Sequence, residues 1–367
     1  MIKKIWKERI ESIRKTFLQN NFDAALFSLA ENISWLTFGG RNHITLNTAE
    51  GVASILVTLE KVYMITNNIE MERIYNEEIP SEIAGEFTPL QYNWWYDEYE
   101  IIEKHFPILK ITSDTKRYGF KSFDKYDQIR NKLSPIEFDN FEYLGKLCDE
   151  ILYDVMTNIS PYDSETEIQG KIFQRFLANN TEPVLALVFG EQSSYQYRHN
   201  LPRNIRIGNK CFASVCVRYR GLIASSTRSV AFENNPSLIE QHRKNCMIDA
   251  AAINYSIPGN PLKKVFEHIV NSYREIGYID EWKKHHQGGL AGYRSRESVA
   301  TPYNEVIIPA ECAVAWNPTI TGTKSEDTAL ITESKKNIVT YPSDSKWPAL
   351  KFDFKNNIIS RPDIFIL

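Results

Sequence analysis

Three histidines are the residues of this chain best suited to proton transfer at neutral pH. His199 lies in the segment 197–202, just before two predicted central strands, and an imidazole titrates near neutral pH. The alternative for His199 is an ordinary histidine of a surface loop. His285 and His286 are adjacent, so in an extended chain their side chains would point to opposite faces. We therefore expect at most one of them to serve a site, and His286, which leads into a Gly-Gly pair, is the better candidate.

Charged side chains near these histidines offer complementary chemistry. Glu297 and Glu326 form a possible carboxylate pair for proton transfer or for gripping a cationic nitrogen, unless each makes a structural ion pair with an arginine. Arg228 lies on a predicted strand and, if it points inward, needs a carboxylate partner, for which we expect Glu326 or Glu297. Arg294 and Arg296 could hold a substrate carboxylate bidentately. The alternative for both is a solvated basic strand edge.

Other kinds of site are excluded by the motifs that the sequence lacks. No CxxC or HExxH pattern is present, so zinc sites of those types are not expected. The glycines at 288 and 289 are followed by no GxGxxG or Lys-Ser/Thr pattern, which excludes a phosphate-binding loop of those types and leaves close approach to a ligand or a plain turn. The cysteine count is odd and the cysteines are scattered, which argues against a disulfide framework and predicts a reducing cytoplasm. They are Cys148, Cys211, Cys216, Cys246 and Cys312.

The composition narrows the class of partner. The 367 residues carry 43 Lys+Arg and 46 Asp+Glu, a net charge of -3, which gives no electrostatic case for nucleic acid or an acidic membrane. No apolar run approaches the roughly 20 residues that span a bilayer. We therefore expect a small-molecule or short-peptide substrate and neither nucleic acid nor membrane as a partner.

The candidate residues belong to the second of two predicted halves. In the first half, a helix with one apolar stripe over 3–18 and short β-branched runs at 24–28, 54–59 and 62–66 predict an α/β domain. In the second half, long helices alternate with antiparallel strands, which predicts an α+β domain. We expect domains at 1–133 and 144–367, joined by a linker at 134–143. The elements predicted for the second half are helices at 144–156, 164–178, 238–255 and 261–276, and strands at 210–219, 222–232, 313–317 and 328–332.

Six segments in the same order resemble one known family. Residues 31–40 (ENISWLTFGG) look like the Asn-Ile-x-Tyr/Trp-Leu-Thr-Gly segment of creatinase-type N-terminal domains, and 198–202 (RHNLP) resemble the segment that carries a histidine of the same superfamily. The remaining four are 221–229 (GLIASSTRS), 288–297 (GGLAGYRSRE), 316–318 (WNP) and 325–328 (SEDT). The chain is identified on these segments as a member of the creatinase/prolidase/aminopeptidase P superfamily. The resemblance implies a creatinase-like N-terminal domain followed by a pita-bread catalytic domain.

The departures from the family pattern lie at the metal positions. Family peptidases hold two divalent metals with two Asp, one His and two Glu, and only the last position keeps a ligand type here. Hydroxyls, an amide and a glycine cannot offset and bridge two dications. We therefore expect no metal and no other cofactor. The five matching positions are Ser214, Ser225, Gly289, Asn317 and Glu326.

The resemblance also implies roles for the remaining residues. Creatinase is the family precedent for metal-free action, and it uses a histidine in the segment that matches His199 as its acid/base group. The expected function is a metal-independent hydrolase or C–N bond-cleaving enzyme on a small amino-acid-like or peptide-like substrate. Glu297 and Glu326 would orient a cationic nitrogen, and Arg296 stands where the family keeps a substrate-contacting histidine. Arg228, His286, Asn317, Ser214 and Ser225 would line the substrate pocket.

The same resemblance leaves two alternative functions open and implies an oligomeric state. The chain could be a divergent Xaa-Pro aminopeptidase or dipeptidase that recruits metal through other residues. It could also be a non-catalytic pseudoenzyme or binding scaffold that retains the pocket. The segment around Arg41 resembles a loop that reaches the active site across family dimers, which implies a homodimer and a place for Arg41 at the substrate.

Overall fold

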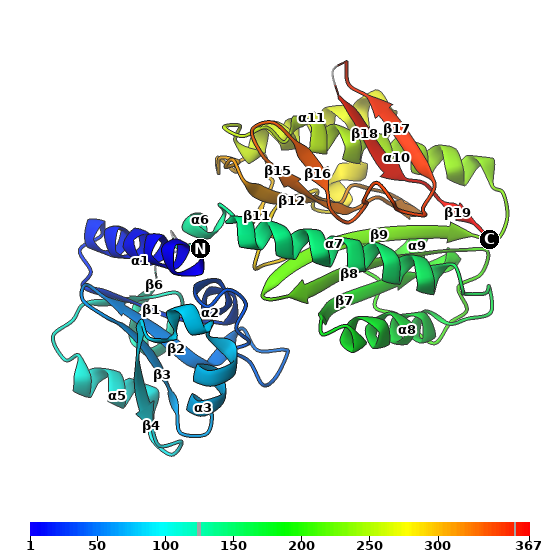
Figure 1. Ribbon diagram of the computed structural model, residues 1–367. Coiled ribbons are helices and arrows are strands. Elements are labelled where there is room, and N and C mark those ends of the chain that lie inside the picture. The colour runs from blue at the N-terminus through cyan, green and yellow to red at the C-terminus, as the bar shows by residue number, and fades with distance from the viewer. Residues whose placement is uncertain (123–125, 356) are drawn as a thin grey trace. The chain divides into compact units, whose positions relative to one another are not determined.

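The structure is a computed structural model that describes residues 1–122, 126–355 and 357–367, and the chain divides into two compact units, Met1–Arg130 and Asn131–Leu367 (Figure 1). We call them the N-terminal and C-terminal units and describe each by itself. The predicted linker at 134–143 is instead the cap and the first turns of a long helix, α7 (Pro135–Met156). The Ser134 backbone N–H donates to the Glu137 carboxylate at 2.7 Å, and Pro135 occupies the first turn, where its missing N–H costs nothing.

The N-terminal unit is built on one mixed sheet of six strands, in the order β4-β3-β2-β1-β5-β6. Strand β1 pairs antiparallel with β2 and parallel with β5. This mixture of parallel and antiparallel pairs with intervening helices is the α/β architecture that the sequence predicts. The elements are α1 (Ile2–Gln19), β1 (Ala24–Leu29), α2 (Ala30–Leu36), β2 (Glu50–Thr58), β3 (Val62–Asn67), α3 (Met71–Arg73), the π-helical η1 (Ile74–Glu78), α4 (Ser81–Ala84), β4 (Phe87–Tyr92), α5 (Glu98–His105), β5 (Ile111–Ser113), the 3-10 helix η2 (Arg117–Gly119), β6 (Lys121–Ser122) and α6 (Tyr126–Arg130).

The apolar stripe of α1 covers one face of this sheet. Trp6, Ile10, Ile13 and Phe17 are buried and recur at helical spacing, which places them on one side of the helix. The helix thus confirms the prediction for 3–18 to within one residue at each end.

The described part of the C-terminal unit combines two large sheets, two two-stranded sheets (β13-β14 and β17-β18) and the helices that pack on them. A five-stranded sheet has the order β11-β10-β12-β15-β16, and a four-stranded sheet has the order β19-β9-β8-β7. The helices are α7 (Pro135–Met156), α8 (Glu165–Ala178), α9 (Glu191–Gln196), α10 (Pro236–Tyr255), α11 (Leu262–Glu275) and the 3-10 helix η3 (Glu281–Lys284). The strands are β7 (Glu182–Phe189), β8 (Lys210–Tyr219), β9 (Leu222–Ala231), β10 (Gly288–Ala291), β11 (Ser298–Val299), β12 (Cys312–Trp316), β13 (Thr319–Ile320), β14 (Thr323–Lys324), β15 (Asp327–Ile331), β16 (Lys336–Ile338), β17 (Ala349–Asp353), β18 (Ile358–Pro362) and β19 (Phe365–Ile366).

The two sheets of this unit meet where β9 lies beside β15. The Thr227 backbone N–H donates to the Glu326 carbonyl at 2.9 Å, and the Ser225 N–H donates to the Thr328 hydroxyl at 2.8 Å. Helices α7 and α8 pack against the four-stranded sheet, and α10 and α11 cover the five-stranded one (Figure 1). Residues at the seam between β9 and β15 are therefore held by both sheets.

The core under α10 and α11 fixes the five-stranded sheet. Ile253, Leu262 and Ile269 from these helices pack with Val314 and Ile331 from the strands, all of them fully buried. The predicted helices and strands of this half are present with ends shifted by one or two residues, except α7, which begins at Pro135 rather than at the predicted 144. In the described part of the chain, no helix combines the length and the apolar character needed to cross a membrane.

Candidate active site

Glu326 is a fully buried carboxylate held between two cations. It follows β14 and precedes β15, and its side chain is 4% exposed. One carboxylate oxygen accepts from Arg296 at 3.0 Å, and the other accepts from Lys324 at 2.8 Å and from the Thr227 hydroxyl at 2.9 Å. Burial by itself would raise the pKa of Glu326, but the charges of Lys324 and Arg296 hold it at about 2. Glu326 is thus ionised and fully partnered.

Two of the substituted metal positions connect to this carboxylate. Ser214 on β8 lies with its hydroxyl 2.7 Å from the hydroxyl of Thr227, which in turn donates to Glu326. Ser225 on β9 accepts from Arg296 at 3.1 Å. The structure therefore brings Ser214, Ser225 and Glu326 together through Thr227 and Arg296.

The other two substituted positions lie on the five-stranded sheet. Asn317 comes directly after β12, where Trp316 pairs with Asp327, so Asn317 lies beside the chain at Glu326. Its side-chain oxygen is buried and has no hydrogen-bond partner among the described residues. At Gly289 on β10, a Cβ atom would lie 2.0 Å from the backbone oxygen of Ser298, so no larger side chain fits there without a shift of the backbone.

The three histidines form one cluster. The Nε2 atoms of His199 and His285 are 3.0 Å apart, and the ring centroids of His285 and His286 are 4.5 Å apart with the rings tilted by 23°. The prediction that His285 and His286 cannot both serve one site is therefore wrong. His285 itself has an extended backbone, but β10 begins only at Gly288, so no strand pairing imposes the alternation of faces on these two residues.

The electrostatics of the cluster tie it to Glu326. Burial lowers the pKa of His285 to about 2 and that of His286 to about 4, and it also lowers the pKa of His199. The charge of Lys324 lowers all three pKa values and that of Glu326 opposes the effect. The three rings are thus neutral imidazoles at pH 7.

Arg228 lies outside this site. It is fully buried and pairs with Asp149 and Asp327, each at 3.0 Å, and not with Glu326 or Glu297 as predicted. Arg361 extends the network by binding Asp327 at 2.6 Å. Arg228 holds elements together and has no substrate-facing charge, because alternate residues of β9 point to opposite faces and its face is the one opposite Ser225 and Thr227.

Two further predicted residues, Glu297 and Arg41, have local partners. Glu297 accepts from the backbone N–H of Tyr293 at 2.8 Å and of Arg294 at 3.3 Å, so it closes the turn between β10 and β11. Arg41 belongs to the N-terminal unit, where it pairs with the buried Glu78 at 3.1 Å. None of these contacts joins Glu297 to Glu326 as a carboxylate pair.

Two residues of the site escaped the sequence analysis. Lys324 and Thr227 both bind Glu326, yet neither was singled out. Lys324 lies two positions before Glu326, a spacing that places two side chains on one face of an extended chain, so this signal was available.

The donor set does not fit the two divalent metals that the resemblance implies. Two metals require several carboxylates to offset four positive charges. The site offers one carboxylate, already paired with Arg296 and Lys324. The hydroxyls and the amide at the other positions are neutral, and Gly289 has no side chain to contribute.

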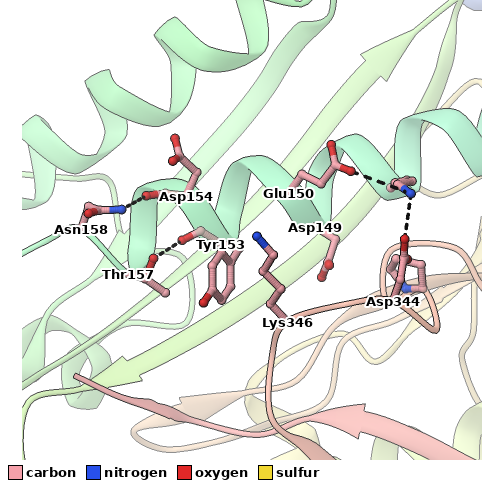
Figure 2. Close-up of a pocket in the computed structure, with 10 residues that line it drawn as sticks. Asp149, Glu150, Tyr153, Asp154, Thr157, Asn158, Asp344 and Lys346 are labelled. Carbon is pink, nitrogen blue, oxygen red and sulfur yellow. Dashed lines mark hydrogen bonds and ion pairs between the residues drawn. The ribbon is translucent and has the colours of Figure 1, made fainter.

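A separate pocket of about 320 Å³ lies between α7 and the segment 342–346 (Figure 2). Its lining carries both signs of charge, for example Lys146 and Asp344, which are 2.8 Å apart. None of the predicted site residues lines it, so it is not the site assembled around Glu326.

Comparison with known proteins places the chain among peptidases of one fold. The family model described as metallopeptidase family M24 matches residues 139–333. The fold is similar to that of an Xaa-Pro dipeptidase from Bacillus anthracis, with a TM-score of 0.79, 16% identity, and coverage of 99% of this chain and 100% of that one. It is also similar to an X-Pro aminopeptidase from Thermotoga maritima (TM-score 0.74, 15% identity, 98% and 100% covered). No curated protein matches the chain in sequence.

One further similar structure is not described as a peptidase. It is the N-terminal domain of the FACT complex subunit SPT16 from chickpea (Cicer arietinum), with a TM-score of 0.69, 12% identity, and coverage of 92% of this chain and 95% of that one. These similarities confirm the fold predicted from the sequence: a creatinase-like N-terminal domain and a pita-bread C-terminal domain.

Proposed function

This chain belongs to metallopeptidase family M24 and is a peptidase-like hydrolase, and we propose that it cleaves a C–N bond in a small amino-acid-like or peptide-like substrate without the family's pair of metals. The observation that carries the proposal is the pairing of Glu326 with Arg296 and Lys324. Where the family places two dications among carboxylates, this chain places two side-chain cations around one carboxylate. The positive charge of the site is thus carried by side chains of the protein and not by bound ions.

The two cations suit the stabilisation of negative charge on a substrate. Glu326 fixes Arg296 and Lys324 in place, which leaves spare N–H donors on both. The Nε of Arg296 is buried and has no partner within the described residues. Preorganised donors of this kind stabilise the oxyanion that forms when a carbonyl is attacked. In this proposal Glu326 is a positioning residue, not the grip for a cationic nitrogen that the sequence suggested.

His199 is the acid/base group in this proposal. A neutral imidazole can take a proton from water as the water oxygen bonds to the carbonyl carbon, and it can return that proton to the nitrogen as the C–N bond breaks. Water is thereby added across the bond, with its hydroxyl on carbon and its proton on nitrogen. Its place in the matching family segment and its neutral form at pH 7 support this role.

Unpartnered polar atoms support a peptide-like substrate. Arg296 offers a buried donor and Asn317 a buried acceptor, neither of which has a partner in the part of the chain that the structure describes. A peptide or amide group presents one carbonyl acceptor and one N–H donor, so it could satisfy both atoms. Without a metal to activate water, a substrate with its own activation, such as a guanidino or amidino group, is the first to test.

The experiment that tests this function uses chelator-treated protein with measured metal content. It is assayed on Xaa-Pro dipeptides and on guanidino and amidino amino acids. We expect turnover by the metal-free protein and a loss of about 10²–10⁴-fold in the His199→Ala variant. Turnover that appears only when two metal ions per chain are restored would overturn the proposal in favour of a divergent Xaa-Pro peptidase.

A binding scaffold is the second candidate. The pairing of Glu326 with Arg296 and Lys324 occupies the one carboxylate that a hydrolase could otherwise use in catalysis. A scaffold binds the substrate panel or a peptide partner without turning it over. Activity assays of the parent protein and isothermal titration of His199→Ala separate the two candidates. A scaffold shows no activity in the parent protein, and its His199→Ala variant keeps the ligand affinity of the parent.

We also propose a homodimer in a reducing cytoplasm. The five cysteines are all buried and unpaired, which agrees with a reducing compartment. Sedimentation that shows a monomer at working concentration would remove the dimer.

A further inference from the structure

We infer that His199, His285 and His286 form a binding site for one transition-metal ion, separate from the two-metal positions of the family. Each histidine offers one ring nitrogen, and these nitrogens all lie within 4.8 Å of one another. Three neutral imidazoles are ligands preferred by Zn²⁺, Co²⁺, Ni²⁺ and Cu²⁺.

The distances are close to those of a bound ion. At a metal–nitrogen distance of about 2.1 Å, two ligand nitrogens on one ion are at most about 4.2 Å apart. His199 and His285 already meet this limit, with their Nε2 atoms 3.0 Å apart. The full set exceeds it by a margin that a small rotation of one imidazole removes. His286 is the more exposed of the two adjacent histidines, so its ring is the one that would rotate.

A partly buried ion pair holds the two histidine-bearing segments against each other. Arg198, next to His199, pairs with Glu281 in η3, the helix that leads into His285 and His286. Glu281 and Arg198 also share Thr321: its N–H donates to Glu281 at 2.8 Å, and its hydroxyl accepts from Arg198 at 2.6 Å. The cluster therefore does not depend on contacts between the histidines themselves.

Each segment is also anchored on its other side. Asn200 donates to Glu165 at 2.9 Å and to the Val188 carbonyl at 2.7 Å, which fixes the chain after His199. Gln287 is fully buried, and its side-chain oxygen accepts from the Tyr273 hydroxyl at 3.1 Å, which fixes the chain after His286. A ligand set on anchored segments loses less conformational freedom on binding an ion.

The neighbouring charges set the strength of the site. Lys324 and Arg296 oppose a dication, and Glu326 offsets only one of them. We therefore expect weaker binding than at a structural zinc site with thiolate ligands. The cluster-facing Nε2 of His285 has the His199 ring as its partner, so an ion bound there replaces a contact within the cluster.

A metal at this site would inhibit the enzyme, and this consequence rests on the proposed function. An imidazole nitrogen bound to an ion cannot accept a proton, so His199 would cease to act as a base. Metal binding itself depends only on the three histidines and is measured without any substrate. The two claims can therefore fail separately.

The test titrates chelator-treated protein with Zn²⁺ by calorimetry and with Co²⁺ by visible absorption. We expect one ion per chain. His286→Gln and His285→Gln should each weaken binding by more than roughly 10–100-fold, the loss found when even an outer-shell partner of a metal ligand is removed. Because His285 is buried, circular dichroism checks that the His285→Gln variant folds. His286 is more exposed, so His286→Gln is less prone to misfolding.

Two control variants locate the ion. His105→Gln removes an exposed histidine of the N-terminal unit and should leave binding unchanged. Glu326→Gln should reduce affinity less than His286→Gln does, because Glu326 acts only through its charge. No binding of Zn²⁺ or Co²⁺, or two ions per chain, would overturn the inference. So would binding that persists in His286→Gln and disappears in Glu326→Gln protein that circular dichroism shows to be folded.

Discussion

The Oε1 atom of Glu326 lies 3.0 Å from a guanidinium nitrogen of Arg296, and both side chains are more than nine-tenths buried. Arg296 stands on the segment before β11 and Glu326 before β15, so the pair joins two strands of one sheet to the serines of the other. The one carboxylate that this chain retains at the family's metal positions is thus part of a salt bridge.

Glu326→Gln should destabilise the protein strongly. The substitution leaves Arg296 and Lys324 buried without their counter-charge, and removal of one partner from a buried pair costs about 3–5 kcal/mol. Urea unfolding measures the free energy. Asp344→Asn, which breaks an exposed contact with Lys146, is the control and should have little effect. Equal stability of Glu326→Gln and the parent would show that the pairing is not maintained in solution.

Gly289→Ala should lower the free energy of unfolding by about 1–3 kcal/mol, because the added Cβ meets a backbone oxygen at 2.0 Å. Gly289→His, which restores the family's ligand type, should be worse and should bind no additional metal. Gly170→Ala is the matched control, since nothing lies within 4 Å of its Cβ in α8 and alanine favours a helix by about 1 kcal/mol. Thermal melts measure the stability of each variant, and metal analysis counts its bound ions. A stable Gly289→His protein with two bound metals would contradict the account.

Arg228→Met should cost about 3–5 kcal/mol of stability, because it leaves Asp149 and Asp327 short of a buried counter-charge. If Arg228 instead contacts substrate, the variant keeps its melting temperature and raises KM. Denaturation and kinetics on the same preparation distinguish these results.

Lys210 gives a pH dependence of stability above neutrality. Burial lowers the pKa of Lys210 from 10.5 to about 8, so between these values the unfolded chain binds more protons than the folded one. Stability contributed at this position therefore rises with pH from about 8 to 10.5. The difference in unfolding free energy between the parent and Lys210→Met should shift in favour of the parent over that window. A difference that is constant from pH 7 to 10 would show that the pKa is not lowered.

Local signals in the sequence were sufficient for most elements. The helix predicted at 164–178 starts with a Ser-x-x-Glu pattern, and the Ser164 N–H donates to Glu167 at 2.7 Å. The predicted strands at 210–219 and 222–232 leave only Arg220 and Gly221 between them, and both residues have positive φ, as a two-residue hairpin turn requires. The linker prediction failed because the stretch contains Pro135 and shows little apolar periodicity, although proline is favoured in the first turn of a helix.

The partners of buried charges were beyond local signals. Arg228 pairs with Asp149 and Asp327, which are far from it in the sequence. Nothing in the residues next to Arg228 indicates either partner. The candidate site was predictable to the level of Ser214, Ser225 and Glu326, because a family resemblance supplies tertiary information. The sequence analysis named all three histidines but did not expect His285 and His286 to lie together. Their placement depends on where β10 begins, at Gly288, which local signals did not give.

The measurement that tests the central claim most directly is turnover by the protein after its metals have been removed and counted. The account predicts that hydrolysis of the responsive substrate continues with fewer than about 0.1 metal ions per chain, a level too low for a stoichiometric centre, and that added Zn²⁺ suppresses it. Activity that is abolished by chelation and restored in proportion to two bound metals per chain would contradict it.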